Sequence, residues 1–139
     1  MILGIGTDIV CTARLSGMVE AYGDRFLCRV FTSREVQTAG QRATLSERLG
    51  TRFAAKEACM KALGTGWRCG VHFTQIEVRK HPSGMPELVL TGAAKKRAEE
   101  LGVTRIHVSL SHESDKAMAV VILEGPESAS VGAESHATA

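Results

Sequence analysis

The hydrophobic pattern of the first ten residues, MILGIGTDIV, predicts a β-strand over residues 2–10. Side chains alternate between the two faces of a strand. One face carries large apolar side chains, among them Leu3, Ile5 and Ile9, and we expect this face to contact the core. The other face is bare backbone at two glycines and ends in a carboxylate at Asp8.

The glycine face has two interpretations, and both stay open at this point. Gly4 and Gly6 weaken a strand unless another group has to approach the backbone closely. In the first interpretation a helix packs tightly there, and Asp8 caps the helix that follows. In the second, a small ligand or a metal ion binds at the end of the strand, beside Asp8.

Periodicity and turn residues predict short helices and hairpin-joined strands in the rest of the chain. Helices are expected over residues 12–22, from Thr32 or Ser33, over about 44–63 and over 92–102, and strands over 73–80, 87–90, 105–111 and 116–124. Hairpin-paired strands with segregated helices favour an α+β fold over a parallel doubly wound sheet. We expect one domain over residues 1–125 and a disordered tail over 126–139.

Composition narrows the class of protein. A chain of 139 residues, 44% of them hydrophobic, is expected to form one domain with a modest core, and such domains often complete their burial by oligomerising. The net charge of +2 and the 4% of aromatic residues argue against a nucleic-acid partner. We expect neither a membrane span nor a leader. The four cysteines form no CxxC pair and no His-spaced metal pattern, which predicts free thiols in a reducing cytoplasm.

The segment 44–63, TLSERLGTRFAAKEACMKAL, contains the strongest helical pattern. Its apolar stripe consists of Leu45, Leu49, Phe53, Met60 and Leu63. A second surface is made of alanines, where another backbone can lie close. Glu57 lies between these two surfaces, and Lys61 follows one turn later. The two are either an i,i+4 ion pair on a solvated face, or Glu57 is a carboxylate between buried surfaces and needs another partner.

Asp8 and Glu57 together offer two hard oxygen ligands from separate elements. Such a pair suits Mg²⁺, which keeps several waters and is commonly held by one or two carboxylates plus substrate phosphates. It does not suit a structural zinc site, which needs Cys or His ligands. Lys61 supplies a compact positive charge for a phosphate. The opening G-x-G does not indicate dinucleotide binding, because the third glycine of that motif would fall at Ile9.

The strand RIHVSLS, residues 105–111, adds a row of polar side chains. Its apolar residues alternate toward a core, while His107, Ser109 and Ser111 face the other way and His112 begins the turn. This is either a half-solvated strand or a wall of hydroxyl and imidazole groups for a phosphate or a ribose. A Ser–His–Asp hydrolase is not expected, because Ser111 and His112 point apart and no G-x-S-x-G elbow is present.

Three segments taken together resemble a known family. GIGTDIV at the N-terminus, RFAAKEACMKALGTG at 52–66 and SLSHESDKAMAVVI at 109–122 are similar to the signature segments of holo-[acyl carrier protein] synthase. This is the small, single-domain class of 4′-phosphopantetheinyl transferases. The resemblance covers about residues 1–124, in the right order and spacing.

The resemblance implies an α+β, Mg²⁺-dependent enzyme that is usually a homotrimer with active sites at subunit interfaces. Such enzymes move the phosphopantetheine arm of coenzyme A onto a serine of apo-acyl carrier protein and release adenosine 3′,5′-bisphosphate. The carrier serves fatty acid or polyketide biosynthesis. By similarity, Asp8, Glu57 and Lys61 are catalytic: Asp8 and Glu57 bind the metal, and Lys61 contacts phosphate. The candidate for accepting the proton of the serine hydroxyl is Glu57 or a metal-bound water that Glu57 holds.

The resemblance also implies two sets of binding residues. The coenzyme A cleft is expected to include Arg52, Lys61, Gly66, Ser111 and His112. The carrier protein is expected to contact Arg14, Met18 and Arg25. Trp67-Arg68-Cys69 departs from the family, in which smaller residues follow G-T-G. Two alternatives stay open: a coenzyme A or nucleotide-binding module without turnover, and a Mg²⁺-dependent phosphohydrolase.

Overall fold

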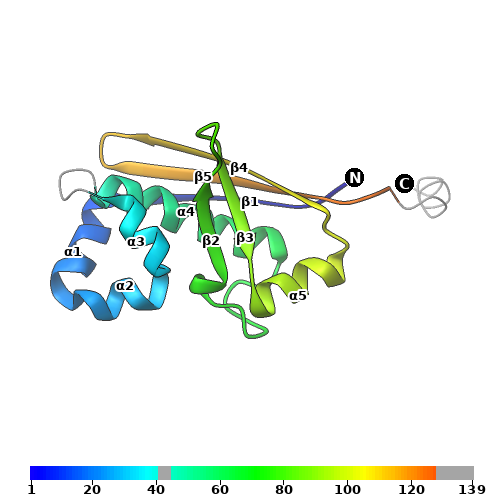
Figure 1. The fold of residues 1–139 in the computed structure, drawn as a ribbon, viewed down its shortest axis with the longest axis horizontal. Helices are drawn as coiled ribbons and strands as arrows, with labels where there is room; N and C mark the ends of the chain where they lie inside the picture. Colours follow the sequence, from blue (N-terminus) through cyan, green and yellow to red (C-terminus); the bar gives the residue numbers. More distant parts are fainter. Residues whose placement is uncertain (41–44, 128–139) are drawn as a thin grey trace, which may run out of the picture.

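A computed structural model describes residues 1–40 and 45–127 of the chain (Figure 1). In chain order the elements are β1 (Ile2–Cys11), α1 (Thr12–Tyr22), α2 (Asp24–Val30), α3 (Ser33–Ala39), α4 (Leu45–Leu63), the 3₁₀ turn η1 (Phe73–Gln75), β2 (Ile76–Lys80), β3 (Pro86–Leu90), α5 (Gly92–Leu101), β4 (Arg105–Glu113) and β5 (Lys116–Glu124). The tail that we expect to be disordered, residues 126–139, lies outside the described residues from residue 128 on.

The three long strands form one antiparallel sheet in the order β1-β5-β4, and the hairpin β2–β3 forms a second, smaller sheet. Helix α4 packs across one face of the larger sheet. Helices α1–α3 gather at one end of the molecule and α5 lies toward the other (Figure 1). The main core lies around α4, and α1–α3 enclose a second cluster with the start of α4. The expected α+β fold is confirmed.

The face of β1 that contacts the core is the glycine face, so the expectation that the larger apolar side chains point inward is wrong for Ile5 and Ile9, whereas Leu3 packs against the core. Ile5 and Ile9 are 61% and 66% exposed. A Cβ atom on Gly6 would lie only 1.8 Å from the carbonyl oxygen of Ala58, and one on Gly4 would lie 2.2 Å from another carbonyl of α4. The two backbones touch because neither glycine has a side chain. The alanine surface of α4 is confirmed as the place of close approach.

Local structure differs from expectation in the segment before β2 and around two helices. The strand expected over 73–80 begins as η1, because the Gln75 N–H donates to the His72 carbonyl oxygen and the Gln75 side chain accepts the His72 N–H. Helix α2, seven residues long, was not expected, since so short a segment has little periodicity. The helix start at Thr32 is confirmed by a capping box, whereas Thr91 makes no side-chain cap before α5.

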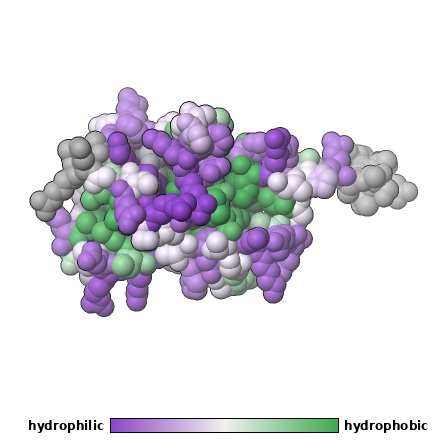
Figure 2. All heavy atoms as spheres, viewed as in Figure 1, coloured by the Kyte–Doolittle hydropathy of each residue, from purple (hydrophilic) through white to green (hydrophobic). Residues whose placement is uncertain are grey.

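The surface has two distinct regions. The outer face of the three-stranded sheet, opposite α4, carries exposed apolar side chains at Ile5, Ile9 and Met118. On the face seen in Figure 2, strongly hydrophilic side chains cross the middle of the molecule, where α3 and β2 meet in Figure 1. Within residues 1–40 and 45–127, no helix has the length and apolar character to cross a membrane.

Candidate active site

Asp8 lies near the end of β1, on the face that packs toward α4. Its side chain is 18% exposed, and its Oδ1 accepts a hydrogen bond from Lys61 Nζ at 3.2 Å. The same ammonium donates to the carbonyl oxygen of Thr7 at 2.9 Å. Asp8 does not cap α1, because the cap position of that helix is Cys11 and the Thr12 N–H donates to the backbone carbonyl oxygen of Asp115. The capping interpretation of Asp8 is therefore wrong.

Glu57 lies on α4, one residue before the Ala58 carbonyl that faces Gly6, so the close contact of β1 and α4 brings it toward Asp8. Partial burial raises the pKa of the Glu57 carboxyl, the negative charge of Asp8 raises it further, and Lys61 partly offsets both effects. Among the described residues, Lys61 forms its ion pair with Asp8 rather than with Glu57. The two carboxylates and the ammonium thus form one cluster between a strand and a helix.

This cluster fits the ligand chemistry of Mg²⁺. Asp8 and Glu57 supply carboxylate oxygens only, from two elements held together by backbone contact at the glycines. The part of the chain that the structure describes contains no group of three or more His, Cys, Asp or Glu side chains that could hold a metal ion. Two carboxylates leave the remaining positions of an octahedral ion to water and to substrate phosphates, as is usual for Mg²⁺.

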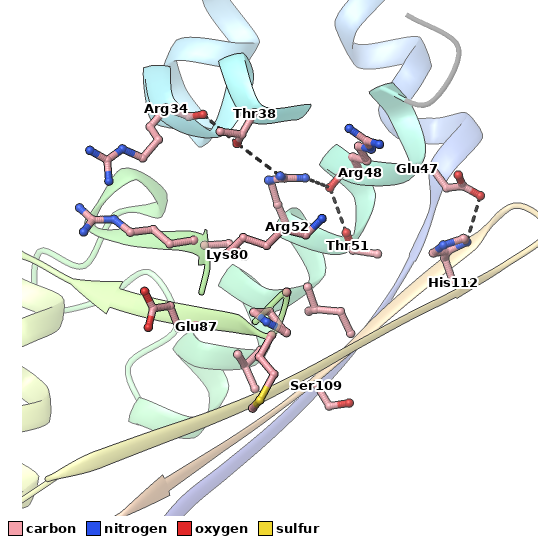
Figure 3. A pocket seen from close by; sticks show the side chains of 17 residues that line it. Arg34, Thr38, Glu47, Arg48, Thr51, Arg52, Lys80, Glu87, Ser109 and His112 are labelled. Atoms are coloured by element: carbon pink, nitrogen blue, oxygen red, sulfur yellow. Dashed lines mark hydrogen bonds and ion pairs between the residues drawn. The ribbon is translucent and has the colours of Figure 1, made fainter. Parts of the chain in front are cut away.

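A cavity of about 950 Å³ opens between α3, α4, the β2–β3 hairpin and β4 (Figure 3). Its walls carry five side chains that are always or nearly always cationic: Arg34, Arg48, Arg52, Arg79 and Lys80. Two carboxylates, Glu47 and Glu87, also line it. Positive charge therefore predominates, which favours an anionic ligand with several phosphate groups.

Arg52 reaches into this cavity from the middle of α4 (Figure 3). Its guanidinium donates to the Arg48 carbonyl oxygen at 3.0 Å and to the Thr38 hydroxyl at 3.4 Å. The Arg52 Nε is buried and has no hydrogen-bond partner among the described residues. Burial lowers the pKa of Arg52, while the charge of Glu35 raises it and that of Arg48 lowers it. A buried donor without a partner is costly, so this nitrogen favours an acceptor in the cavity.

His112 lines the same cavity from the end of β4. Its Nδ1 lies 2.9 Å from Glu47 Oε1, near the start of α4 (Figure 3). Of the other residues predicted for the coenzyme A cleft, Gly66 lies in the exposed loop after α4 with φ +54°, and Ser111 is exposed on β4. Neither lines the cavity, and nor does Lys61.

The predicted site residues therefore fall into two groups within one copy of the chain. Asp8, Glu57 and Lys61 form the carboxylate cluster, whereas Arg52 and His112 belong to the cationic cavity. No residue of the cluster lines the cavity. In a single copy of the chain, the carboxylate cluster and the cationic cavity are therefore separate.

The residues predicted to contact a carrier protein lie on the helices at one end of the molecule. Arg14 and Met18 are exposed on α1, and Met18 is 40% exposed. Arg25 is exposed on α2. These placements leave all three side chains accessible to a partner.

Several cationic residues of the cavity were not identified from the sequence. Arg48 precedes Arg52 by four residues, a spacing that puts both guanidinium groups on one side of a helix, and this signal was available. Arg34, Arg79 and Lys80 come from other elements, and nothing in their local sequence indicates that they meet α4.

Comparison with known proteins gives a consistent family. A sequence model described as the 4′-phosphopantetheinyl transferase superfamily matches residues 4–121. A holo-[acyl-carrier-protein] synthase of Koribacter versatilis is 47% identical over 124 residues, which cover 89% of this chain and 99% of that protein. A protein of the same name from Solibacter usitatus is 45% identical, with the same coverage.

Solved structures agree with the sequence comparison. The crystal structure of holo-[acyl-carrier-protein] synthase from Neisseria meningitidis superposes with a TM-score of 0.81 at 40% identity, covering 89% of this chain and 99% of that one. The Helicobacter pylori protein of the same name, solved in complex with coenzyme A, has a TM-score of 0.77 at 31% identity, covering 86% of this chain and 99% of that one.

Proposed function

The chain belongs to the 4′-phosphopantetheinyl transferase superfamily, as an enzyme of the holo-[acyl carrier protein] synthase family, and we propose that it transfers phosphopantetheine from coenzyme A to a serine of apo-acyl carrier protein with Mg²⁺ held by Asp8 and Glu57. The carboxylate cluster of Asp8, Glu57 and Lys61 carries this proposal, because it joins the two metal-type ligands and a phosphate-binding cation. The carrier belongs to fatty acid or polyketide biosynthesis. The free cysteines fit a cytoplasmic enzyme.

The reaction is a phosphoryl transfer, so positioning and charge neutralisation supply most of the catalysis. The serine oxygen of the carrier forms a bond to the phosphorus of the phosphopantetheine arm, and the bond from that phosphorus to adenosine 3′,5′-bisphosphate breaks. When bound, Mg²⁺ supplies positive charge to the diphosphate oxygens. Glu57 accepts the serine proton in this proposal. Lys61 contacts the phosphate through its ammonium group, at the end of a side chain that is 54% exposed.

Coenzyme A is the anionic ligand that we assign to the cationic cavity. It carries a diphosphate and a 3′-phosphate, and the cavity offers several guanidinium groups besides the unpartnered Arg52 Nε. The coenzyme A complex of the Helicobacter pylori relative supports this ligand. His112 contributes an imidazole at the other side of the cavity.

We further propose that the complete site forms between copies in a homotrimer. The carboxylate cluster and the cavity are separate in one copy, and the apolar outer face of the sheet, with Ile5, Ile9 and Met118, is available to a neighbouring copy. Co-expression of Asp8→Ala with Arg52→Ala tests this arrangement. Each variant alone should be inactive, whereas about a quarter of the sites in a randomly mixed ring combine an intact cluster with an intact cavity. Mixed assemblies no more active than either variant would contradict a shared site.

The carrier protein docks, in this proposal, on α1 and α2. Arg14 and Arg25 supply positive charge and Met18 an exposed apolar side chain. Carrier proteins of this type are acidic, so the charges complement one another and accelerate association.

Chromatographic analysis of products distinguishes the proposal from its alternatives. We expect adenosine 3′,5′-bisphosphate to appear only when coenzyme A, Mg²⁺ and apo-carrier protein are all present. Product formed without carrier would indicate a phosphohydrolase. Bound coenzyme A that is never consumed would indicate a binding module.

A further inference from the structure

A buried ion pair joins α3 to α4 behind the cationic cavity. Glu35 Oε1 and Lys56 Nζ lie 2.7 Å apart, and both side chains are 0% exposed. Neither residue belongs to the carboxylate cluster, and neither lines the cavity. The pair is therefore an interior feature for which the proposed reaction has no direct use.

The pair also binds the backbone of two further segments. Glu35 Oε1 accepts the Thr32 N–H at 2.9 Å, and Oε2 accepts the Val78 N–H of β2 at 2.9 Å. Lys56 Nζ donates to the carbonyl oxygens of Phe73 and Ile76. One carboxylate and one ammonium thus connect α3, α4, η1 and β2.

Stability alone does not explain this pair. Two charges lose their hydration on burial, and well-packed apolar residues of similar volume are often as stable or more stable. Burial lowers the pKa of Lys56, and Glu35 acts in the opposite direction. What an apolar pair cannot reproduce is the set of directed hydrogen bonds that joins these four elements at one point.

The elements joined by the pair are the ones that carry the cavity's positive charges. Arg34 precedes Glu35 on α3, and Arg79 and Lys80 follow Val78 on β2. Arg52 lies one turn before Lys56 on α4. Like charges around a cavity repel one another, so these walls need a restraint to keep their spacing before an anion arrives.

We propose that Glu35 and Lys56 are positioning residues that hold α3 and β2 at a fixed spacing from α4, so that the cationic cavity is preformed for the phosphate groups of coenzyme A. The inference rests on the proposed function, because it assumes that coenzyme A occupies this cavity. A preformed site loses less free energy in ordering its side chains on binding. Loss of the pair should therefore weaken coenzyme A binding more than it slows the chemical step.

The test replaces both charges in the double variant Glu35→Leu/Lys56→Met, which keeps an apolar interior. We expect a folded protein whose Kd for coenzyme A, measured by calorimetry, rises about tenfold or more. Its KM for coenzyme A should rise by the same factor, while kcat at saturating coenzyme A changes less than about threefold. A folded double variant with unchanged Kd and KM overturns the proposal.

Two further variants separate positioning from stability. Glu35→Gln keeps the shape and a carbonyl acceptor but removes the charge, so it should fold and raise the Kd for coenzyme A less than the double variant does. If the double variant does not fold, an unchanged Kd in Glu35→Gln overturns the proposal. Cys59→Ala, one turn along α4 and also buried, is the control for a weakened interior. It should lower the melting temperature and leave the Kd unchanged. An equal rise in Kd for this control would mean that affinity only follows stability.

The outcome is independent of whether transfer occurs. Wild-type enzyme that binds coenzyme A but releases no adenosine 3′,5′-bisphosphate refutes the proposed function, whereas the positioning role is judged from the ratio of variant to wild-type Kd.

Discussion

A methyl group added at Gly6 should displace the carboxylates of Asp8 and Glu57 from each other, although it touches neither. The Cβ atom of Gly6→Ala would lie 1.8 Å from the carbonyl oxygen of Ala58, and Cβ atoms in proteins essentially never come within 3.0 Å of such an atom. The backbones of β1 and α4 must therefore separate by the difference, about 1.2 Å. Asp8 follows Gly6 by two residues and Glu57 precedes Ala58 by one, so this separation moves the two carboxylates apart.

The magnitude follows from this displacement. A misplacement of about 1 Å can cost about 10²-fold in rate, and overpacking of a buried contact costs about 1–3 kcal/mol of unfolding free energy. We expect Gly6→Ala to lower kcat/KM by about 10²-fold or more and to reduce the melting temperature. Transfer kinetics and thermal unfolding monitored by circular dichroism measure the two effects.

Gly17→Ala on α1 is the matched control. A Cβ atom there meets nothing within 4 Å, and alanine is the better helix former, so this variant should unfold at the wild-type temperature or slightly above it. The KM for coenzyme A should not change. If Gly6→Ala behaves like Gly17→Ala in rate and in melting temperature, then the contact between β1 and α4 does not set the geometry of the site.

Four further predictions concern single side chains. Glu57→Gln should reduce transfer by about 10²-fold or more, and without Mg²⁺ it should raise the melting temperature at neutral pH. Because the pKa of Glu57 is raised in the folded state, ionisation of this carboxyl lowers the free energy of unfolding as pH rises. The gain in melting temperature should therefore vanish below the ordinary glutamate pKa. Lys61→Met should slow transfer but unfold near the wild-type temperature, since so exposed an ion pair contributes about 0–1 kcal/mol; unfolding with unchanged specific activity would make Lys61 structural. Cys59 should resist alkylation at pH 8 in the folded protein, because burial raises the pKa of its thiol to about 12; mass spectrometry of the labelled protein would reveal the opposite. Arg14→Glu should raise the KM for the carrier protein strongly and that for coenzyme A little, with a defect that shrinks as salt rises; weaker coenzyme A binding would assign Arg14 to the cofactor cleft instead.

Most of the elements, α2 and η1 excepted, and the carboxylate cluster could be predicted from the sequence, because periodicity and the small residues of β1 and α4 are local signals. The glycines of β1 and the alanines of α4 both indicate close backbone approach, and together they bring Asp8 toward Glu57. The orientation of β1 could not be predicted in the same way. Large apolar side chains normally mark the buried face, but here the close packing of Gly4 and Gly6 on the helix leaves Ile5 and Ile9 outside.

The cationic cavity and the buried ion pair of Glu35 and Lys56 could not be predicted from local sequence patterns. Glutamate and lysine are usually found at the protein surface, and Glu35 and Lys56 form a pair only because α3 packs on α4. The cavity's arginines come from three elements separated along the chain. Non-local packing decides such arrangements, whereas periodicity reports only on single elements.

Intact-mass measurement of a purified apo-acyl carrier protein shows directly whether this enzyme transfers phosphopantetheine. After incubation with coenzyme A, Mg²⁺ and the wild-type enzyme, the carrier should gain the mass of one phosphopantetheine group on a serine, and it should gain none with Asp8→Ala. Fatty acid and polyketide carriers assayed side by side would show which one is served. If neither carrier is modified by the folded wild-type enzyme, or if Asp8→Ala modifies a carrier equally well, the proposed transfer reaction and its metal site are contradicted.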